Sequence, residues 1–209
     1  MKKVLFLFFL MLGVVSSGCA IGTTRVVIDH DPLVPIVQKK KGNIAVEPFK
    51  DVREQKEYIG NKRNGFGMVL GHIGTMENET LEGLLTKYFA EALTEAGYNV
   101  YITGGSPIDA GAKIDLTVSG EIKEFFLDLY MMTWHYMTVD LKAFDPETRQ
   151  VAWEKEVKSE EKVILWIGAT AEFERVIRLS LTKALDQAAK EFASDDFSKY
   201  IKQDKETSQ

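Results

Sequence analysis

Residues 133–143 read Thr-Trp-His-Tyr-Met-Thr-Val-Asp-Leu-Lys-Ala, and their alternation is the strongest evidence for the fold class. Every second residue from Thr133 to Ala143 suits a protein core, and most of the residues between them are polar or amphipathic. A period of two predicts a β-strand that shows one face to a core. The preceding run at Ile114, Leu116, Val118 and Ile122 also alternates, so we expect two neighbouring strands of an antiparallel sheet.

Turn and strand signals surround these two runs. Residues 145–148 read Asp-Pro-Glu-Thr, which is typical of a turn, and residues 151–153 begin a return strand. Residues 43–49 and 98–102 are short, apolar and β-prone, and Pro48 predicts the end of the first of these strands.

Two segments change to the period of a helix. Residues 79–96 and roughly residues 170–193 each place their apolar side chains at steps of three and four, which forms one continuous stripe. Gly97 is expected to stop the first helix, and Asn78 is expected to cap its N-terminus. Phe197, Tyr200 and Ile201 form a short amphipathic tail that can dock on the core.

The order of these elements is β-α-β-β-β-β-α. Because each helix has a single apolar stripe, we predict an α+β fold in which two long helices pack on one face of an antiparallel sheet of four to five strands.

The N-terminus carries a secretion signal. Lys2 and Lys3 precede an apolar run over residues 4–15, which is shorter than the ~20 residues of a membrane-spanning helix. Small residues follow and lead directly into Cys19, the only cysteine. Residues 1–18 are therefore predicted to be a cleaved signal peptide.

The cleavage site resembles the lipobox of bacterial lipoproteins, since residues 15–19 read Val-Ser-Ser-Gly-Cys. The resemblance implies a diacylglycerol thioether and an acylated amino group, and hence palmitate-type chains, on Cys19. Two or more acyl chains give stable anchoring. Ala20, directly after the cysteine, resembles the residue that directs such proteins to the outer membrane. An aspartate at this position would retain them at the inner membrane.

Domain boundaries follow from this signal. We expect a lipidated N-terminus and tether over residues 19–42, a single α+β domain over 43–202 and a polar tail over 203–209. Removal of residues 1–18 leaves 191 residues, and the loss of two lysines changes the net charge from −5 to −7. An acidic chain is a poor candidate for nucleic-acid binding.

Two apolar segments precede the helices and are candidates for a functional surface. If the helices run the same way, both segments meet at one end and form a patch for a membrane, a lipid or a partner protein. If each segment folds back over its own helix, no patch forms. The candidate patch residues are Phe66, Met68, Leu70, Ile73, Leu165 and Trp166.

The hairpin region is also rich in aromatic residues and methionine, in excess of what one core face requires. This composition suits either an adaptable interface or strands that are buried on both sides. The residues are Phe125, Phe126, Tyr130, Met131, Met132, Trp134 and Tyr136.

Catalytic signatures are sparse. His30, His72 and His135 lack a paired-ligand spacing, and the glycines of residues 65–74 do not form a dinucleotide fingerprint. We therefore expect no metal, no cofactor and no catalytic residue. Asp51 and Arg53 suit a surface ion pair or turn hydrogen bond more than a ligand site.

Several segments, in this order along the chain, are similar to the YajG family of bacterial lipoproteins. They are the lipobox, residues 24–28, Asp51-x-Arg53 with Ile59-Gly60, residues 92–100 and residues 197–202. A looser likeness exists to LptE-type and ABC-transport auxiliary lipoproteins. The resemblance implies a small lipoprotein that faces the periplasm and has no assigned reaction.

These observations predict an outer-membrane lipoprotein that acts as a non-catalytic binding, structural or accessory component of the cell envelope, with an envelope protein as its partner. The alternative is a carrier or enzyme for an envelope lipid or glycan, which needs a cavity between the helices and the sheet.

Overall fold

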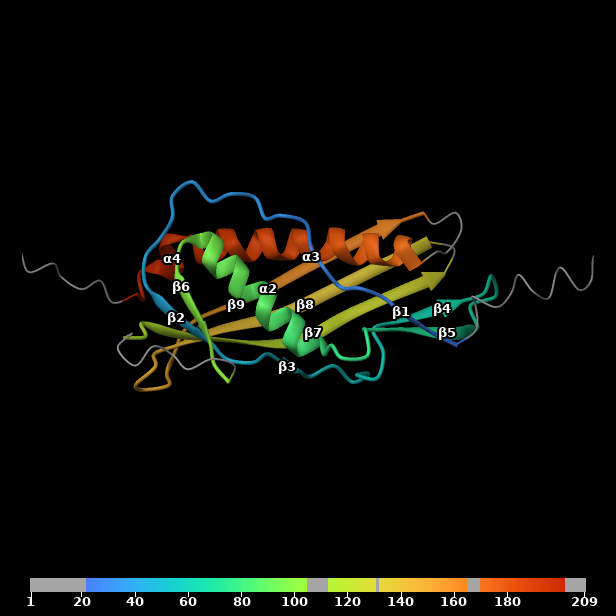
Figure 1. Ribbon diagram of the computed structural model, residues 1–209, viewed down its shortest axis with the longest axis horizontal. Coiled ribbons are helices and arrows are strands. Elements are labelled where there is room, and N and C mark those ends of the chain that lie inside the picture. The colour runs from blue at the N-terminus through green and yellow to red at the C-terminus, as the bar shows by residue number, and fades with distance from the viewer. Residues whose placement is uncertain (1–21, 105–112, 131, 165–169, 202–209) are drawn as a thin grey trace, which may run out of the picture.

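The computed structural model describes residues 22–104, 113–130, 132–164 and 170–201, and these form two layers (Figure 1). A mixed sheet of nine strands is one layer, and two long helices cover one of its faces. The strands are β1 (Gly22–Arg25), β2 (Asn43–Val46), β3 (Lys50–Asp51), β4 (Gly60–Arg63), β5 (Val69–Gly74), β6 (Asn99–Ile102), β7 (Leu116–Tyr130), β8 (Met132–Phe144) and β9 (Val151–Val163). The helices are α2 (Leu81–Ala96), α3 (Thr170–Phe192) and the short α4 (Asp195–Ser198).

The long strand β7 organises the sheet. One of its edges pairs with β8, which pairs in turn with β9, and both pairings are antiparallel. Its other edge receives three short parallel strands one after another, β2, β3 and β4. The sheet continues beyond β2 into β6, and beyond β4 into β5 and then β1.

The α+β class and the covering of one sheet face by both helices are confirmed, but the predicted sheet was too small and too uniform. The alternating runs and the return strand form the antiparallel part, β7 to β9. The additional strands have two to six residues, too few for a visible alternation. Two of them, β3 and β4, pair in parallel with β7 and so join residues far apart in the chain, which no local pattern reports.

The helix ends follow capping rules. Thr80 caps α2, because its side chain accepts a hydrogen bond from the Gly83 amide, so the prediction of Asn78 as the cap was wrong. Gly97 ends α2 as predicted, with a φ of 108° in the left-handed region that favours glycine.

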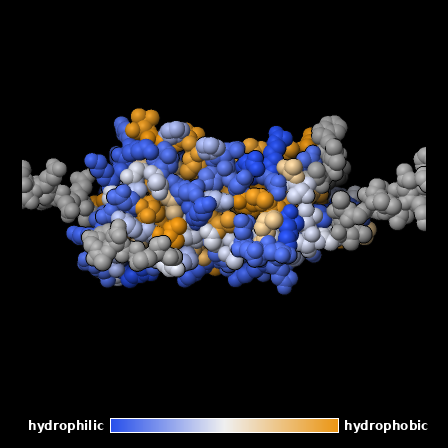
Figure 2. Space-filling view, viewed as in Figure 1, coloured by the Kyte–Doolittle hydropathy of each residue, from blue (hydrophilic) through white to orange (hydrophobic). Residues whose placement is uncertain are grey.

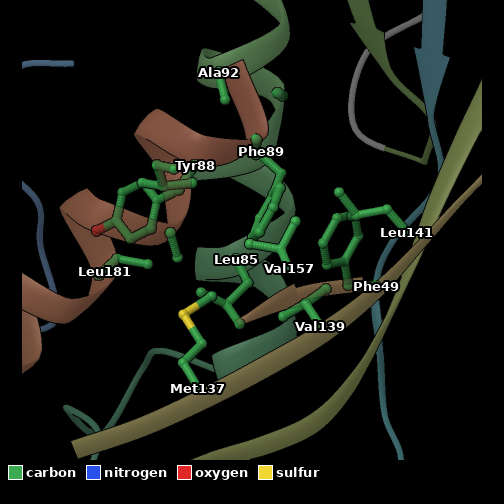
Figure 3. Close-up of a cluster of buried hydrophobic side chains, with 14 of the residues drawn as sticks. Phe49, Leu85, Tyr88, Phe89, Ala92, Met137, Val139, Leu141, Val157 and Leu181 are labelled. Carbon is green, nitrogen blue, oxygen red and sulfur yellow. The ribbon is translucent and has the colours of Figure 1, made fainter. Parts of the chain in front are cut away.

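The core lies between the helices and the sheet (Figure 3). Leu85 and Phe89 of α2 point towards Met137 and Val139 of β8, and Val157 of β9 lies beside them. These five side chains are at most 1% exposed. The odd-numbered residues of the opening stretch therefore face the core, as their alternation predicts.

The segment predicted to be a tether is part of the fold. Residues 22–25 form β1, and Val26 and Ile28 behind it are 0% and 2% exposed. The chain then crosses the outer side of α3 (Figure 1), and hydrogen bonds tie it to both α3 and α2. We call residues 26–40 the strap. Residues 22–40 therefore belong to the folded domain, which corrects the expected boundary at residue 42.

Candidate functional site

The strap is held by a row of polar side chains on α3. Glu174 accepts a hydrogen bond from the Val27 amide at 2.9 Å, and Asp186 accepts one from the Val34 amide at 2.8 Å. Between them, Thr182 accepts from the Asp31 amide at 2.9 Å, and Arg178 pairs with Asp29 at 2.6 Å. The four α3 residues are spaced by four, so they lie on one face of the helix.

Helix α2 holds the same strap from the other side. The Tyr88 hydroxyl donates to the Ile28 carbonyl at 2.6 Å, and Glu95 accepts from the Ile36 amide at 3.2 Å. The Val26 amide continues the pairing of β1 by donating to the Gly74 carbonyl of β5, and the Lys40 amide donates to the Ala96 carbonyl at the end of α2. Between these two ends, the side chains of α2 and α3 satisfy several of the strap's backbone groups. The only sequence signal for the strap was the four-residue spacing of polar positions on α3.

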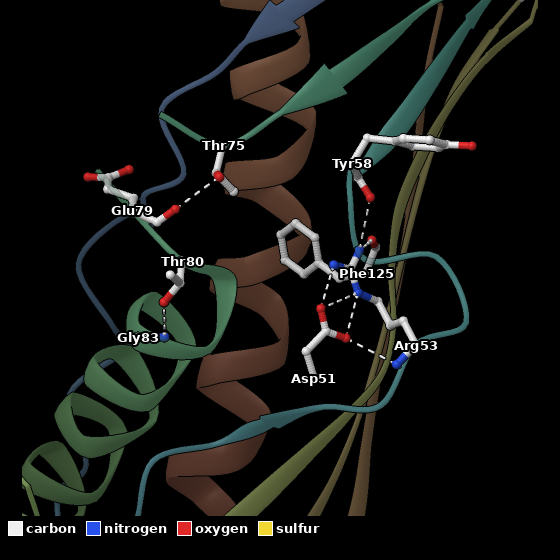
Figure 4. Close-up of polar contacts among 8 residues, drawn as sticks. All are labelled: Asp51, Arg53, Tyr58, Thr75, Glu79, Thr80, Gly83 and Phe125. Atoms are coloured by element: carbon white, nitrogen blue, oxygen red, sulfur yellow. Dashed lines mark hydrogen bonds and ion pairs between the residues drawn. The ribbon is translucent and has the colours of Figure 1, made fainter. Parts of the chain in front are cut away.

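Asp51 and Arg53 make the predicted turn hydrogen bond, in which Asp51 accepts from the Arg53 amide at 3.0 Å, but their ion pair is buried rather than at the surface (Figure 4). The guanidinium donates to both carboxylate oxygens, at 2.9 and 2.7 Å. It also donates to the Phe125 carbonyl at 2.9 Å. Phe125 lies on the stretch of β7 between the β3 and β4 pairings, so Arg53 occupies a gap in the sheet ladder.

The charge state of this pair follows from its surroundings. Burial alone raises the pKa of the Asp51 carboxyl, but the hydrogen bonds and the charge of Arg53 outweigh it and hold the pKa below its usual value. A cleft of about 190 Å³ opens beside the pair towards the start of α2, where Glu57, Glu79 and Glu82 line it. Because Asp51 already occupies the guanidinium, Arg53 is not free to bind an anionic ligand.

Two serine–lysine spacings invite comparison with serine hydrolases, and neither is arranged for catalysis. Ser159 stands three residues before Lys162, and Ser180 stands three residues before Lys183. The two serine hydroxyl oxygens lie 2.7 Å apart between β9 and α3, and both residues are buried. Lys183 instead pairs with Glu161, and the Lys162 ammonium lies over the Trp134 ring. The serines therefore join the helix to the sheet.

His135 lies in the core with Thr133 beside it on the same strand face. Burial lowers the pKa of His135 to about 3, so the ring is neutral near pH 7. Within the described residues, neither nitrogen of the His135 ring has a hydrogen-bond partner, and the Thr133 hydroxyl has none either. The described part of the chain also holds no group of three or more residues suited to a metal ion.

The predicted apolar patch is reshaped by the structure. Residues 69–74 form strand β5 rather than a loop, and Ile73 is fully buried in it, so its assignment to a surface patch was wrong. Phe66 and Met68 are 90% and 59% exposed at the turn before β5, and Leu70 is half-buried. Leu165 and Trp166 lie outside the described residues, as does Cys19.

The two long helices do run the same way, with their first residues on the side of β4 and β5 (Figure 1). Three further exposed apolar residues, which were not among the candidate patch residues, lie at this end: Val69, Tyr130 and Ile164. By contrast, the helix-covered face in Figure 2 is mostly hydrophilic, with hydrophobic residues in small separate groups. No helix in the described ranges is long and apolar enough to cross a membrane.

The aromatic cluster is divided between the two sheet faces. Phe125 is fully buried under the helices, whereas Phe126, Trp134 and Tyr136 are half-buried on the face that α2 and α3 leave uncovered. Trp134 and Tyr136 lie nearly parallel, with ring centroids 6.2 Å apart. Met131 lies outside the described residues.

The fold has known relatives among solved structures, although no family model and no curated protein matches the sequence. A protein from Xanthomonas campestris, assigned to the family model DUF330, matches with a TM-score of 0.61 and 11% identity over 79% of this chain and 92% of its own. The lipoprotein GNA1162 from Neisseria meningitidis matches with a TM-score of 0.40 and 13% identity over 71% of this chain and 98% of its own.

The first likeness shows a shared fold, and the second is too distant to support an argument. The finer assignment to the YajG family stays a prediction.

Proposed function

We propose that this protein is a lipid-anchored component of the bacterial cell envelope and that it acts by binding rather than by catalysis. The observation that carries the proposal is a run of small residues ending in Cys19, directly before a folded domain whose first strand begins at Gly22. A signal of this kind provides a membrane anchor without a spanning helix.

The proposed location is the outer membrane, with the domain facing the periplasm. Ala20 after the cysteine and the resemblance to the YajG family support this placement. The partner in this proposal is another envelope protein, and the half-buried Trp134 and Tyr136 on the uncovered sheet face offer it an aromatic surface.

The buried polar groups support binding over catalysis, because Asp51, Arg53, Ser159 and Ser180 all make contacts that hold the fold together. The rival proposal of a lipid or glycan carrier requires space between helices and sheet. In the described residues, fully buried side chains such as Phe89, Val139 and Leu181 fill this layer (Figure 3).

Metabolic labelling with radioactive palmitate, followed by separation of the inner and outer membranes, tests the anchor. We expect label in the outer-membrane fraction for the natural chain and no label for Cys19→Ala. Absence of label in the natural chain would refute the anchor.

In-cell cross-linking from an introduced photoreactive residue at Tyr136 tests the partner. A discrete adduct with an envelope protein is expected, and the same residue placed at the buried position Val139 serves as the control. Adducts with neither proteins nor lipids at Tyr136 would contradict the proposed binding surface.

A further inference from the structure

Four strands end in register at one end of the sheet. Lys62 of β4 pairs with Leu129 of β7, Leu129 with Thr133 of β8, and Thr133 with Val163 of β9. These residues form one row across the sheet, and neighbouring strands are ~4.8 Å apart. The residues just beyond this row on the four strands therefore lie together at one narrow end of the molecule.

The side chains beyond this row include a group of exposed apolar residues, which we call the apolar tip. Phe66 and Met68 in the β4–β5 turn are 90% and 59% exposed, and the first β5 residue, Val69, is 43% exposed. Tyr130 at the end of β7 and Ile164 after β9 are 40% and 62% exposed. A Cβ added at Gly67 would lie 3.8 Å from the Tyr130 ring, so the turn and the β7 end are neighbours.

The N-terminal end of the domain lies beside the apolar tip. Gly22 pairs with Gly71, which is two residues from Val69, and β1 runs away from the tip. Cys19 precedes Gly22 by three residues, a span of at most ~11 Å at full extension. An acyl chain on Cys19 therefore holds this end of the domain close to the bilayer surface.

The domain cannot move further from the membrane by detaching its first residues unless it breaks contacts within the fold. Beyond β1, Val26 and Ile28 are buried in the core, and the strap is bound to both helices. The strap residues thus do not act as a flexible spacer between the lipid and the domain.

We propose that the apolar tip inserts into the headgroup layer of the membrane that holds the Cys19 anchor, so that β7, β8 and β9 stand on the bilayer with α4 at the distal end. This inference rests on the proposed lipid anchor and adds an orientation to it. The bilayer is the one surface that the short connection between Cys19 and Gly22 brings to the tip.

The side chains just behind the tip fit the boundary between membrane and water. Trp134 and Lys162 pair across β8 and β9 in the row next to Thr133 and Val163, and the Lys162 ammonium lies 4.2 Å from the centre of the Trp134 ring. Aromatic rings and lysines concentrate at the headgroup level of membrane proteins. Arg63 in the tip hairpin has its charge matched by Asp128 at 2.7 Å.

A single introduced thiol can report the orientation, because lipidation consumes the only natural cysteine. We would prepare the lipidated full chain with Phe66→Cys, reconstitute it in vesicles of phosphatidylethanolamine and phosphatidylglycerol, and measure the reaction rate with a water-soluble thiol reagent. Insertion to headgroup depth should slow the reaction by about tenfold relative to Phe66→Cys combined with Cys19→Ala, which has no lipid and no second thiol.

The matched control is Val151→Cys, which is 52% exposed at the opposite end of β9. Its reaction rate should not change on reconstitution. Equal rates for Phe66→Cys with and without vesicles would overturn the inference, and so would slowing at residue 151 instead. Protection of residue 66 in intact envelopes, but not in vesicles, would also overturn it by showing that a protein covers the tip.

Co-flotation with the vesicles separates the two proposals. If the natural chain is found to carry no lipid and does not float with the vesicles, the proposed anchor is refuted. A lipidated chain that floats, with the thiol at residue 66 still fully reactive, refutes only the orientation.

Discussion

The buried polar residues of this protein differ in whether their side chains have hydrogen-bond partners. Arg53 has a carboxylate and backbone carbonyls to donate to, whereas His135 and Thr133 have no partner in the described ranges. A buried polar group without a hydrogen bond costs ~1–3 kcal/mol, and a satisfied one costs far less. Substitutions at these residues should therefore have opposite effects.

We expect His135→Leu to reduce the pH dependence of stability. The folded-state pKa of His135 is about 3, and the unfolded-state pKa is ~6.5. Below ~pH 6.5 the unfolded state binds a proton that the folded state excludes, so stability falls by up to ~1.4 kcal/mol per pH unit until the folded state is also protonated near pH 3. Urea denaturation between pH 7 and pH 4 measures this slope.

Thr133→Val is the matched control, since it removes a buried hydroxyl without a titrating group. It should raise the free energy of unfolding by ~1 kcal/mol equally at every pH. A slope that is unchanged in His135→Leu would show that His135 does not dominate the acid sensitivity over this range.

Arg53→Ala should be strongly destabilising, because it leaves the Asp51 carboxylate buried without a counter-charge and the Phe125 carbonyl without a donor. Loss of one member of a buried ion pair costs ~3–5 kcal/mol. Arg63→Ala, which breaks a partly exposed pair with Asp128, should cost ~1 kcal/mol or less. Equal losses for the two variants in chemical denaturation would contradict the buried role of Arg53.

At the scale of elements, β1 and the strap depend on contacts with residues far away in the chain. Gly71 in β5 is the clearest case, because a Cβ at this position would lie 2.1 Å from the Gly22 carbonyl oxygen. The close approach of two backbones requires a residue without a side chain.

Gly71→Ala should therefore displace β1 from the sheet. Amide exchange at residues 23–26 is expected to become much faster, while the exchange of β7 and β8 amides stays slow. Gly65→Ala is the control, since nothing lies within 4 Å of a Cβ there. Protection of β1 that is the same in both variants would count against this packing.

Thr182→Val should loosen the strap without unfolding the domain. The valine keeps the side-chain shape but cannot accept the hydrogen bond from the Asp31 amide. We expect exchange of that amide to accelerate about fivefold, which corresponds to ~1 kcal/mol. Thr94→Val on α2 removes only a bond within its own helix and should leave the strap unaffected.

At the scale of the whole molecule, the boundary of the folded domain can be tested by truncation. A chain that begins at Gly22 keeps Val26, Ile28 and the strap, whereas one that begins at Asn43 loses them. Each buried aliphatic side chain contributes ~1.5–3 kcal/mol, so the second chain should lose about 5 kcal/mol or fail to fold. Similar denaturation midpoints for both truncations would support the prediction from the sequence that residues 19–42 are a tether.

The elements whose signals are local could be predicted from the amino-acid sequence alone. Strands β7 and β8 and both long helices carry a period of two or of three to four that any short window displays. Gly97 and the turn at Asp145 depend on the conformation and hydrogen bonds of a few adjacent residues, and the Asp145 carboxylate does accept from the Thr148 amide. The lipobox at Cys19 is likewise a local signal and remains a prediction.

The elements that gain stability from distant partners became apparent only in the folded protein. Strands β1, β3 and β4 have two to four residues each, and the ladder to which they add, rather than their own sequence, makes them strands. The strap has no period because side chains of α2 and α3 satisfy much of its backbone, and only its two ends bond to backbone carbonyls. The apolar tip arises because four strands end in one row, and the register of strands that are distant in the chain is set by the packing of the whole sheet.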